Sequence, residues 1–168
     1  PLIRRFVGGL VYGDQLMLLS NQTKPYEVNK GESMALVQEW VEKISQMLTE
    51  GKGYTLEELD ETLMQITKSF TKIEIKKEPK VKVGIVGEIY VKYSKMANNG
   101  LEEFLAEQDC EVCVPGIMGF ASFKVDNRLE DIKMFGGSKL KFRACQMLLN
   151  YLTKVERLMI EAAVRYGF

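Results

Sequence analysis

The sequence predicts a helix-rich, mixed α/β fold, with helices in the first half and a small parallel sheet in the second. Three observations lead to this class. Apolar residues recur at three- and four-residue steps between residues 32 and 70, which is typical of helices that bury one face. Strand-like, helix-like and strand-like segments follow one another over residues 81–115, as in a right-handed βαβ unit. A long helical pattern begins near Ser138.

The first of two regions, residues 1–78, is predicted to be helical. A first helix is expected over residues 2–19 and a loop over residues 20–33. A helical hairpin then covers about residues 32–76, because two periodic segments are joined by a short glycine-rich turn.

The hairpin carries clear boundary signals. Its first helix ends at Gly51. Its second helix begins at Thr55, and Glu58 completes a capping box three residues later. The apolar stripe of the first helix comprises Val37, Trp40, Val41, Ile44, Met47 and Leu48, and that of the second comprises Leu56, Leu59, Leu63, Ile66 and Phe70.

The second region, residues 79–168, begins where Pro79 blocks helix continuation and strand-like residues follow. Its first part should form the βαβ unit of a small parallel sheet. The expected elements are a strand over residues 81–89, a loop up to Asn99, a helix over residues 100–108 capped by Asn98 or Asn99, and a strand over residues 110–115.

The rest of this region is expected to return to helix. A loop containing glycine and phenylalanine should precede a short helix over residues 127–135. The long C-terminal helix then begins near Ser138. Its apolar side comprises Leu148, Leu152, Val155, Met159 and Ala162.

Composition narrows the range of functions. The 168 residues include 23 Lys and Arg against 23 Asp and Glu, so no charged field is expected to attract nucleic acid or an anionic membrane. No segment has the length and hydropathy of a membrane span, and no secretory pattern is visible, so a cytoplasmic protein is predicted. Histidine is absent, which excludes Ser-His and Cys-His nucleophiles within this chain.

The first candidate site is GIVGEIYVKYSKMANNG, residues 84–100. The three-glycine dinucleotide fingerprint is not met, and neither is the Gly-Lys-Ser/Thr ending of a P-loop. Its position still favours a ligand site, because open α/β sheets bind ligands at the carboxyl ends of their strands. The side chains at that edge would be Glu88, Tyr90, Asn98 and Asn99. The alternative is a plain turn, in which Gly87 eases the strand exit and the asparagines cap a helix.

The cysteines give a second candidate. Cys110 and Cys113 form a C-x-x-C pair, but CEVCVP is predicted to be a strand, in which residues three apart point to opposite faces. This geometry opposes a shared metal or redox partner. Both residues are interpreted as buried packing residues, and so is Cys145 in the long helix.

A polar patch is the third candidate. Asp14, Lys24, Tyr26 and Glu27 lie in YGDQLMLLSNQTKPYE, residues 12–27, and could perform acid-base chemistry if they converged. A solvated junction between a helix and a loop is the favoured interpretation.

The chain resembles a known protein family over roughly residues 10–120. VYGDQLMLLSNQTKPYE, a helical hairpin and PKVKVGIVGEIYVKYSKMANNGLEEFLAEQDCEVCVPGI follow one another as in the acyl-CoA dehydratase activase-related proteins, of the CoA-substrate-specific enzyme activase family. These large bacterial proteins contain a region similar to the subunits of 2-hydroxyacyl-CoA dehydratases. VGIVGEIYVKYSKMANNGLEEFL, residues 83–105, is the most specific part.

The resemblance implies two Rossmann-like lobes joined by helices, with an iron-sulfur cluster and an acyl-CoA ester in the cleft between them. Electron transfer from an ATP-dependent iron-sulfur activator would start radical dehydration of the 2-hydroxyacyl-CoA. Because this chain begins at Pro1 without a Met, it is expected to be a piece of such a protein. Residues 1–78 would be connecting helices, and residues 79–168 a partial Rossmann-like lobe, with the rest of the parent polypeptide as its partner.

The resemblance also carries over a few residues. Gly87, Glu88, Asn98 and Asn99 match the family pattern near the cleft and are the candidate cofactor-binding or interface residues. The family's cluster-binding cysteines lie in segments unlike CEVCVP. No metal ligand, catalytic residue or cofactor is therefore assigned within this chain.

Two functions are thus expected from different classes. The leading hypothesis is a fragment of a 2-hydroxyacyl-CoA dehydratase-like, activase-related protein that contributes part of an acyl-CoA and iron-sulfur cleft and is inactive alone. The alternative is a non-catalytic interaction or regulatory domain, which docks through Trp40 or through a face of the long helix. A free-standing nucleotide-binding module is disfavoured by the missing glycines.

Overall fold

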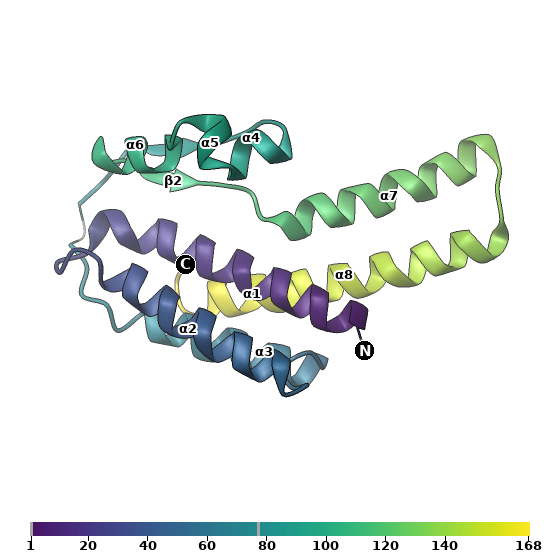
Figure 1. Cartoon of the computed structure of the whole chain (residues 1–168), viewed down its shortest axis with the longest axis horizontal. Helices are drawn as coiled ribbons and strands as arrows, with labels where there is room; N and C mark the ends of the chain where they lie inside the picture. The colour runs from purple at the N-terminus through teal and green to yellow at the C-terminus, as the bar shows by residue number, and fades with distance from the viewer. Residues whose placement is uncertain (1, 77) are drawn as a thin grey trace.

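The computed structural model describes residues 2–76 and 78–168, so Pro1 and Lys77 lie outside the described residues. It has two parts, a helical core and a small α/β lobe above it in the view of Figure 1. The helical core comprises α1 (Leu2–Thr23), the short 3-10 helix η1 (Lys24–Tyr26), α2 (Glu32–Thr49), α3 (Leu56–Phe70), α7 (Ile117–Phe135) and α8 (Lys139–Arg165). The α/β lobe, residues 78–116, contains β1 (Lys82–Gly84), α4 (Ile89–Tyr93), α5 (Lys95–Asn98), α6 (Leu101–Glu107) and β2 (Glu111–Cys113).

The predicted helical hairpin is confirmed by α2 and α3. Gly51 has a φ of +78°, the left-handed conformation that terminates a helix. Thr55 accepts a hydrogen bond from the Glu58 backbone N–H, and the Glu58 side chain accepts one from the Thr55 backbone N–H, so the capping box is present. The turn is therefore bounded by a left-handed glycine at one end and by a capping box at the other.

The first helix is longer than predicted. The loop expected over residues 20–33 is wrong in its first part, because α1 continues to Thr23 and η1 follows directly. Ser20 and Thr23 are both buried, so packing against the core holds this extra turn despite the moderate helix propensity of these residues. This extension carries Asn21 on α1, and Lys24 on η1, to the junction with the α/β lobe.

One hydrophobic core joins the long helices. Its buried residues include Tyr12 and Leu16 from α1, Leu63 and Phe70 from α3, and Leu152 from α8. The remaining members of the predicted stripe of α8 also face this core: Val155 and Ala162 are buried, and Leu148 and Met159 are partly buried against it. The stripe prediction for α8, and its start after Ser138, are confirmed.

The C-terminal helices belong to the helical core by packing, although they follow the α/β lobe in sequence. In Figure 1, α7 leads away from the lobe and α8 returns alongside it toward α1 and α3. Helix α8 packs against α7, α3 and α1. The change of composition near residue 79 marks the entry into the lobe, and the chain re-enters the core at α7.

The α/β lobe contains a two-stranded parallel sheet, which confirms the mixed, helix-rich α/β class in its coarse form. In its register, Lys82 pairs with Glu111, and Gly84 pairs with Cys113. The strand expected over residues 81–89 is much shorter, and the expected loop up to Asn99 contains α4 and α5. One reason is that Glu88 caps α4, since its carboxylate accepts a hydrogen bond from the Tyr90 N–H.

Helix α7 departs most from the prediction. A loop and a short helix over residues 127–135 were expected, but α7 already begins at Ile117. The cap of α7 comes from α1. Both carboxylate oxygens of Asp14 accept backbone N–H groups, from Ile117 at 2.9 Å and from Met118 at 2.7 Å. A partner more than 100 residues away leaves no local signal in the sequence.

Candidate functional site

The predicted site residues lie on the loop after β1 and around the short helices that follow. Gly87 has a φ of +146°, and nothing lies within 4 Å of a Cβ built on it, so the loop needs glycine for its conformation and leaves open space beside it. Val86, before it, is 82% exposed. The carboxyl end of β1 is therefore an open surface that presents both apolar and acidic side chains.

Asn98 has a structural role in this loop. Its Nδ2 donates to the backbone carbonyls of Val91 at 3.0 Å and Lys92 at 3.2 Å. Its Oδ1 accepts from the N–H groups of Gly100 at 3.1 Å and Leu101 at 3.2 Å, at the start of α6. These bonds use the whole donor and acceptor capacity of an asparagine amide, so Asn98 ties α4 to α6. Asn98 thus satisfies N–H groups at the start of α6, as expected of a cap, although the N-cap position itself is Gly100.

Glu88 and Asn99 complete the predicted set. Glu88 is exposed, and one of its oxygens caps α4. Asn99 has a φ of +55°, a left-handed conformation that asparagine tolerates better than most residues, and it ends α5. Of the predicted set, Gly87 and Glu88 therefore remain as residues at the open edge.

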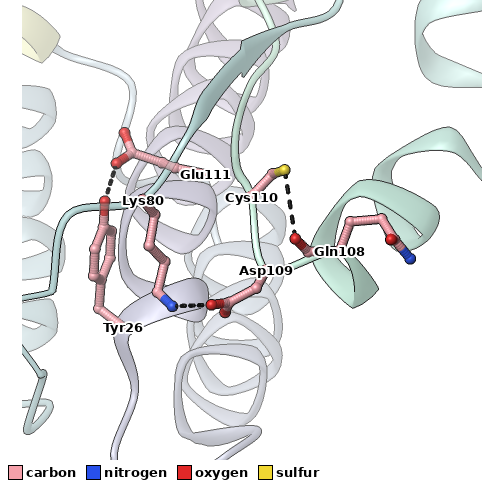
Figure 2. Close-up of polar contacts among 6 residues, drawn as sticks. All are labelled: Tyr26, Lys80, Gln108, Asp109, Cys110 and Glu111. Carbon is pink, nitrogen blue, oxygen red and sulfur yellow. Dashed lines mark hydrogen bonds and ion pairs between the residues drawn. The ribbon is translucent and has the colours of Figure 1, made fainter.

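A cluster of titratable side chains lies where η1 meets the lobe (Figure 2). The Tyr26 hydroxyl donates to Glu111 Oε2 at 2.6 Å. Lys80 Nζ lies 2.5 Å from Asp109 Oδ2 and 5.8 Å from the centroid of the Tyr26 ring. Lys82 reaches the other oxygen of Glu111 at 2.9 Å. These contacts connect the helical core to the strand β2.

The electrostatics of this cluster follow from its partners. The hydrogen bond to the Glu111 carboxylate, helped by burial, raises the pKa of Tyr26 to about 12. The hydrogen bond from Lys80 lowers the pKa of Asp109 below its usual value. Lys80 pairs with Asp109, and Lys82 pairs with Glu111. Because these charges compensate one another, we interpret the cluster as a structural contact between η1 and the lobe and assign no general acid or base to it.

The third predicted patch does not converge. Asp14 is buried within α1 and caps α7, and burial raises the pKa of its carboxyl despite the two backbone bonds. Glu27 is buried too, and it accepts backbone N–H groups from Gly31 at 2.8 Å and Ser33 at 2.6 Å at the start of α2. The expectation of a solvated junction is therefore wrong for these two acids, which both cap helices.

The cysteines are less buried than expected. Cys113 is exposed at the end of β2, and Cys110 and Cys145 are partly buried, so the interpretation of all three as buried packing residues is wrong for Cys113. The Cys110 thiol lies 3.7 Å from the Gln108 carbonyl oxygen (Figure 2). Within residues 2–76 and 78–168, no three His, Cys, Asp or Glu side chains converge on a metal position.

A cavity of about 350 Å³ lies between the helical core and the α/β lobe. One wall comes from α1, η1 and α2, and the other from α5, α6 and β2. Its lining residues are Gly13, Leu16, Met17, Ser20, Asn21, Lys24, Pro25, Met34, Val37, Val41, Lys95, Glu102, Glu103, Ala106, Cys110 and Val112. Its volume falls within the range of small-molecule sites.

None of the four predicted site residues lines this cavity. Val41, assigned to the buried stripe of α2, is instead 47% exposed and forms part of its wall. Lys24 belonged to the predicted polar patch of residues 12–27. The residues that face it across the cavity lie about 80 positions later in the sequence, and only tertiary packing brings them close.

The chain matches no protein-family model, and neither a curated protein nor a solved structure is significantly similar to it. Among the helices of the described residues, none combines the length and the hydropathy needed to cross a membrane.

Proposed function

We propose that this chain supplies one wall of an acyl-CoA cleft in a cytoplasmic, 2-hydroxyacyl-CoA dehydratase-like, activase-related protein, in which its α/β lobe is part of a larger Rossmann-like lobe. The observation that carries this proposal is the open surface at the carboxyl end of β1, formed by Val86, Gly87 and Glu88. Residues 83–105, the segment most similar to the family, contain this surface.

The exposure of this surface supports a role as one wall of a cleft that other groups complete. Val86 and Tyr90 are largely exposed next to Gly87, and carboxyl ends of parallel strands are the usual ligand edge of open α/β sheets. Parallel sheets are normally covered on both faces and extended by further strands, whereas this sheet has two strands among the described residues. The rest of the parent polypeptide, together with a CoA ester, would complete the cleft.

An iron-sulfur cluster does not fit the residues of this chain. Cluster ligation requires several thiolates around one point. Cys110, Cys113 and Cys145 do not converge with each other or with other ligand types among the described residues. Any cluster, and the activator that would reduce it, would therefore act on residues outside this chain, and no chemical step is derived through it.

The test is a titration of the isotopically labelled chain with a short acyl-CoA, followed by NMR. The backbone signals of residues 86–90 should shift at ligand concentrations up to about 1 mM, because a single wall binds weakly. ADP, which lacks the pantetheine and acyl groups, should shift them less. The absence of any shift at this edge would overturn the proposal.

A matched pair of variants sharpens this test. Val86→Asp places a charge beside the proposed acyl path and should abolish the shifts. Val81→Asp is the control, because Val81 is similarly exposed, at 70%, but precedes the opposite end of β1. Equal loss in both variants would point to non-specific repulsion of the anionic CoA and would count against a site at residues 86–90.

The alternative function, an interaction domain, is favoured by a different surface. Leu2, Ile3 and Met147 are exposed and line an apolar groove between α1 and α8. Trp40 does not serve as the docking residue, since it is buried within the chain and its Nε1 donates to Ser69 Oγ at 2.8 Å. Light scattering over a range of protein concentrations tests self-association, and Met147→Glu should abolish it if this groove is the interface.

A further inference from the structure

The cavity between the helical core and the α/β lobe is lined by apolar side chains from several elements and by polar side chains on both walls. Met17, Val37 and Val112 line it from three different elements. Apolar surface of this kind gains stability when a ligand with an apolar body displaces water from it. The cavity lies against α1, α2 and α6, and it includes none of the residues 86–90 that carry the proposed acyl-CoA edge.

Two of the polar lining residues, Asn21 and Lys24, carry hydrogen-bond donors. Asn21 and Lys24 are three residues apart where α1 passes into η1, and both line the cavity. The Asn21 Nδ2 atom is shielded from solvent and has no hydrogen-bond partner among the described residues, and the Glu103 Oε2 atom on the facing wall is likewise shielded and unpartnered. Lys24 forms no ion pair within the part of the chain that the structure describes. A group that accepts hydrogen bonds and carries negative charge would satisfy both donors.

The opposite wall carries one net negative charge, from Lys95, Glu102 and Glu103. The hydrogen bond from Lys95, helped by the charge of Lys24, lowers the pKa of Glu103. Glu103 lies on α6 and forms an ion pair with Lys95 of α5, so its charge is already compensated. Glu102, also on α6, is the other carboxylate of the lining. A ligand anion is therefore best placed at the α1 end, beside Asn21 and Lys24, with its apolar body directed away from them.

We infer that this cavity binds an apolar monocarboxylate, with its hydrocarbon chain between α2 and β2 and its carboxylate at Asn21 and Lys24. The inference goes beyond the proposed acyl-CoA wall, because it concerns a free acid at a separate place. The cavity lies between the lobe and the helical core, so a bound acid would also bridge these two parts.

The experiment compares three probes that share a chain and differ in the head group: octanoate, octanamide and octylamine. Calorimetric titration of the chain should give the tightest binding for octanoate, by about tenfold over octanamide, because only the acid forms charge-assisted bonds with both donors. Octylamine should bind most weakly. Equal affinities for the three head groups, or no binding of octanoate at millimolar concentration, would overturn the inference.

Variants assign the head-group position. Lys24→Met keeps the length of the side chain and should reduce the preference for octanoate over octanamide to about twofold or less, since the charge is removed. Lys154→Met is the control, because Lys154 is exposed on α8, away from the cavity, and the net charge changes equally. Asn21→Leu should weaken octanoate about fivefold, with the exposed Asn127→Leu as its control. Unchanged preference in Lys24→Met would place the carboxylate elsewhere.

Cavity occupancy can also be read from the reactivity of a cysteine. Cys110 lines the cavity and Cys113 is exposed at the end of β2. Octanoate should slow the alkylation of Cys110 by a maleimide, measured for each cysteine by mass spectrometry, and should leave the rate at Cys113 unchanged. Ala106→Trp fills the cavity and should abolish this protection, whereas the exposed Ala144→Trp on α8 should not.

The outcomes separate this inference from the proposed function. NMR shifts at residues 86–90 with acyl-CoA, but no protection of Cys110 by octanoate, would sustain the acyl-CoA wall and refute the acid site. Protection of Cys110 without shifts at residues 86–90 would do the reverse.

Discussion

The carboxylate of Asp14, inside α1, accepts a hydrogen bond from the backbone N–H of Met118 at 2.7 Å, across 104 residues of sequence. This bond and its neighbour to Ile117 fix the point where the chain leaves the α/β lobe and enters α7. The lobe is therefore held to the helical core by two contacts, this cap and the bond between Tyr26 and Glu111 at the start of β2.

Asp14→Asn should lower the free energy of unfolding by about 2 kcal/mol, because one of the two buried N–H groups would face the amide NH₂ instead of an acceptor. Urea denaturation of the two proteins measures the difference. Asp126→Asn is the control, since Asp126 is exposed on α7 and should change the stability by less than about 0.5 kcal/mol. Equal stability of Asp14→Asn and the unmodified chain would show that the cap is dispensable.

Tyr26→Phe should reveal a pH-dependent contribution. The pKa of Tyr26 is raised to about 12 in the folded chain from 10.0, so the folded state holds the proton more tightly. The stabilisation from the bond to Glu111 is thus fully present below pH 10 and is lost as the pH rises from about 10 to about 12. The unmodified chain should exceed Tyr26→Phe by about 1 kcal/mol at pH 8.

Denaturation of both proteins at pH 8 and at pH 11 tests this prediction. Burial raises the pKa of Tyr12 to about 12 as well, but Tyr12 is present in both proteins and its effect cancels in the comparison. If the stability difference is the same at both pH values, the stabilisation by Tyr26 does not require a protonated hydroxyl, and the prediction is wrong.

Asn98→Ala should destabilise the α/β lobe by about 2 kcal/mol, since it removes the acceptor of the Leu101 N–H and the amide donor to α4. The Gly100 N–H keeps its bond to the Lys95 carbonyl. Hydrogen exchange should show faster exchange in α4 and α6 than in α8, because the damage is local. Asn127→Ala on α7 is the exposed counterpart and should leave both rates unchanged. Uniformly faster exchange over the whole chain would indicate global destabilisation instead.

Gly87→Ala should cost about 1 kcal/mol, because a side chain strains a backbone with a φ of +146° even where space is open. Gly84→Ala is the matched control: it has open space too, in the adjacent strand, without a positive φ. Thermal unfolding of the two variants gives the comparison. Equal midpoints would mean that the loop adapts its conformation at no cost.

Elements whose signals are local could be predicted from the sequence. The capping box of Thr55 and Glu58, and the apolar stripe of α8, need only neighbouring residues. The start of α7 could not be predicted, because its cap comes from Asp14. The capping role of Glu27 was not predicted either. Its carboxylate accepts the N–H groups of Gly31 and Ser33, four and six residues later, a spacing that matches no capping motif.

The candidate site shows the same division. Gly87 and Glu88 were placed correctly at a strand exit, because glycine and polar residues after an apolar run are a local pattern. The cavity was missed because its walls meet only in the folded chain. Asn21 belongs to α1 and Glu103 to α6, and neither neighbourhood in the sequence indicates the other.

The return of α8 to α1 and α3 makes the order of synthesis matter. The α/β lobe is inserted between two stretches that build one core, so Leu152 and Val155 meet their partners in α1 and α3 only after the lobe and α7 have been made. During translation, α1 to α3 would expose the apolar face that α8 later covers. A ribosome-bound chain that ends before Lys139 should therefore recruit chaperones strongly, and release from them should coincide with the emergence of α8.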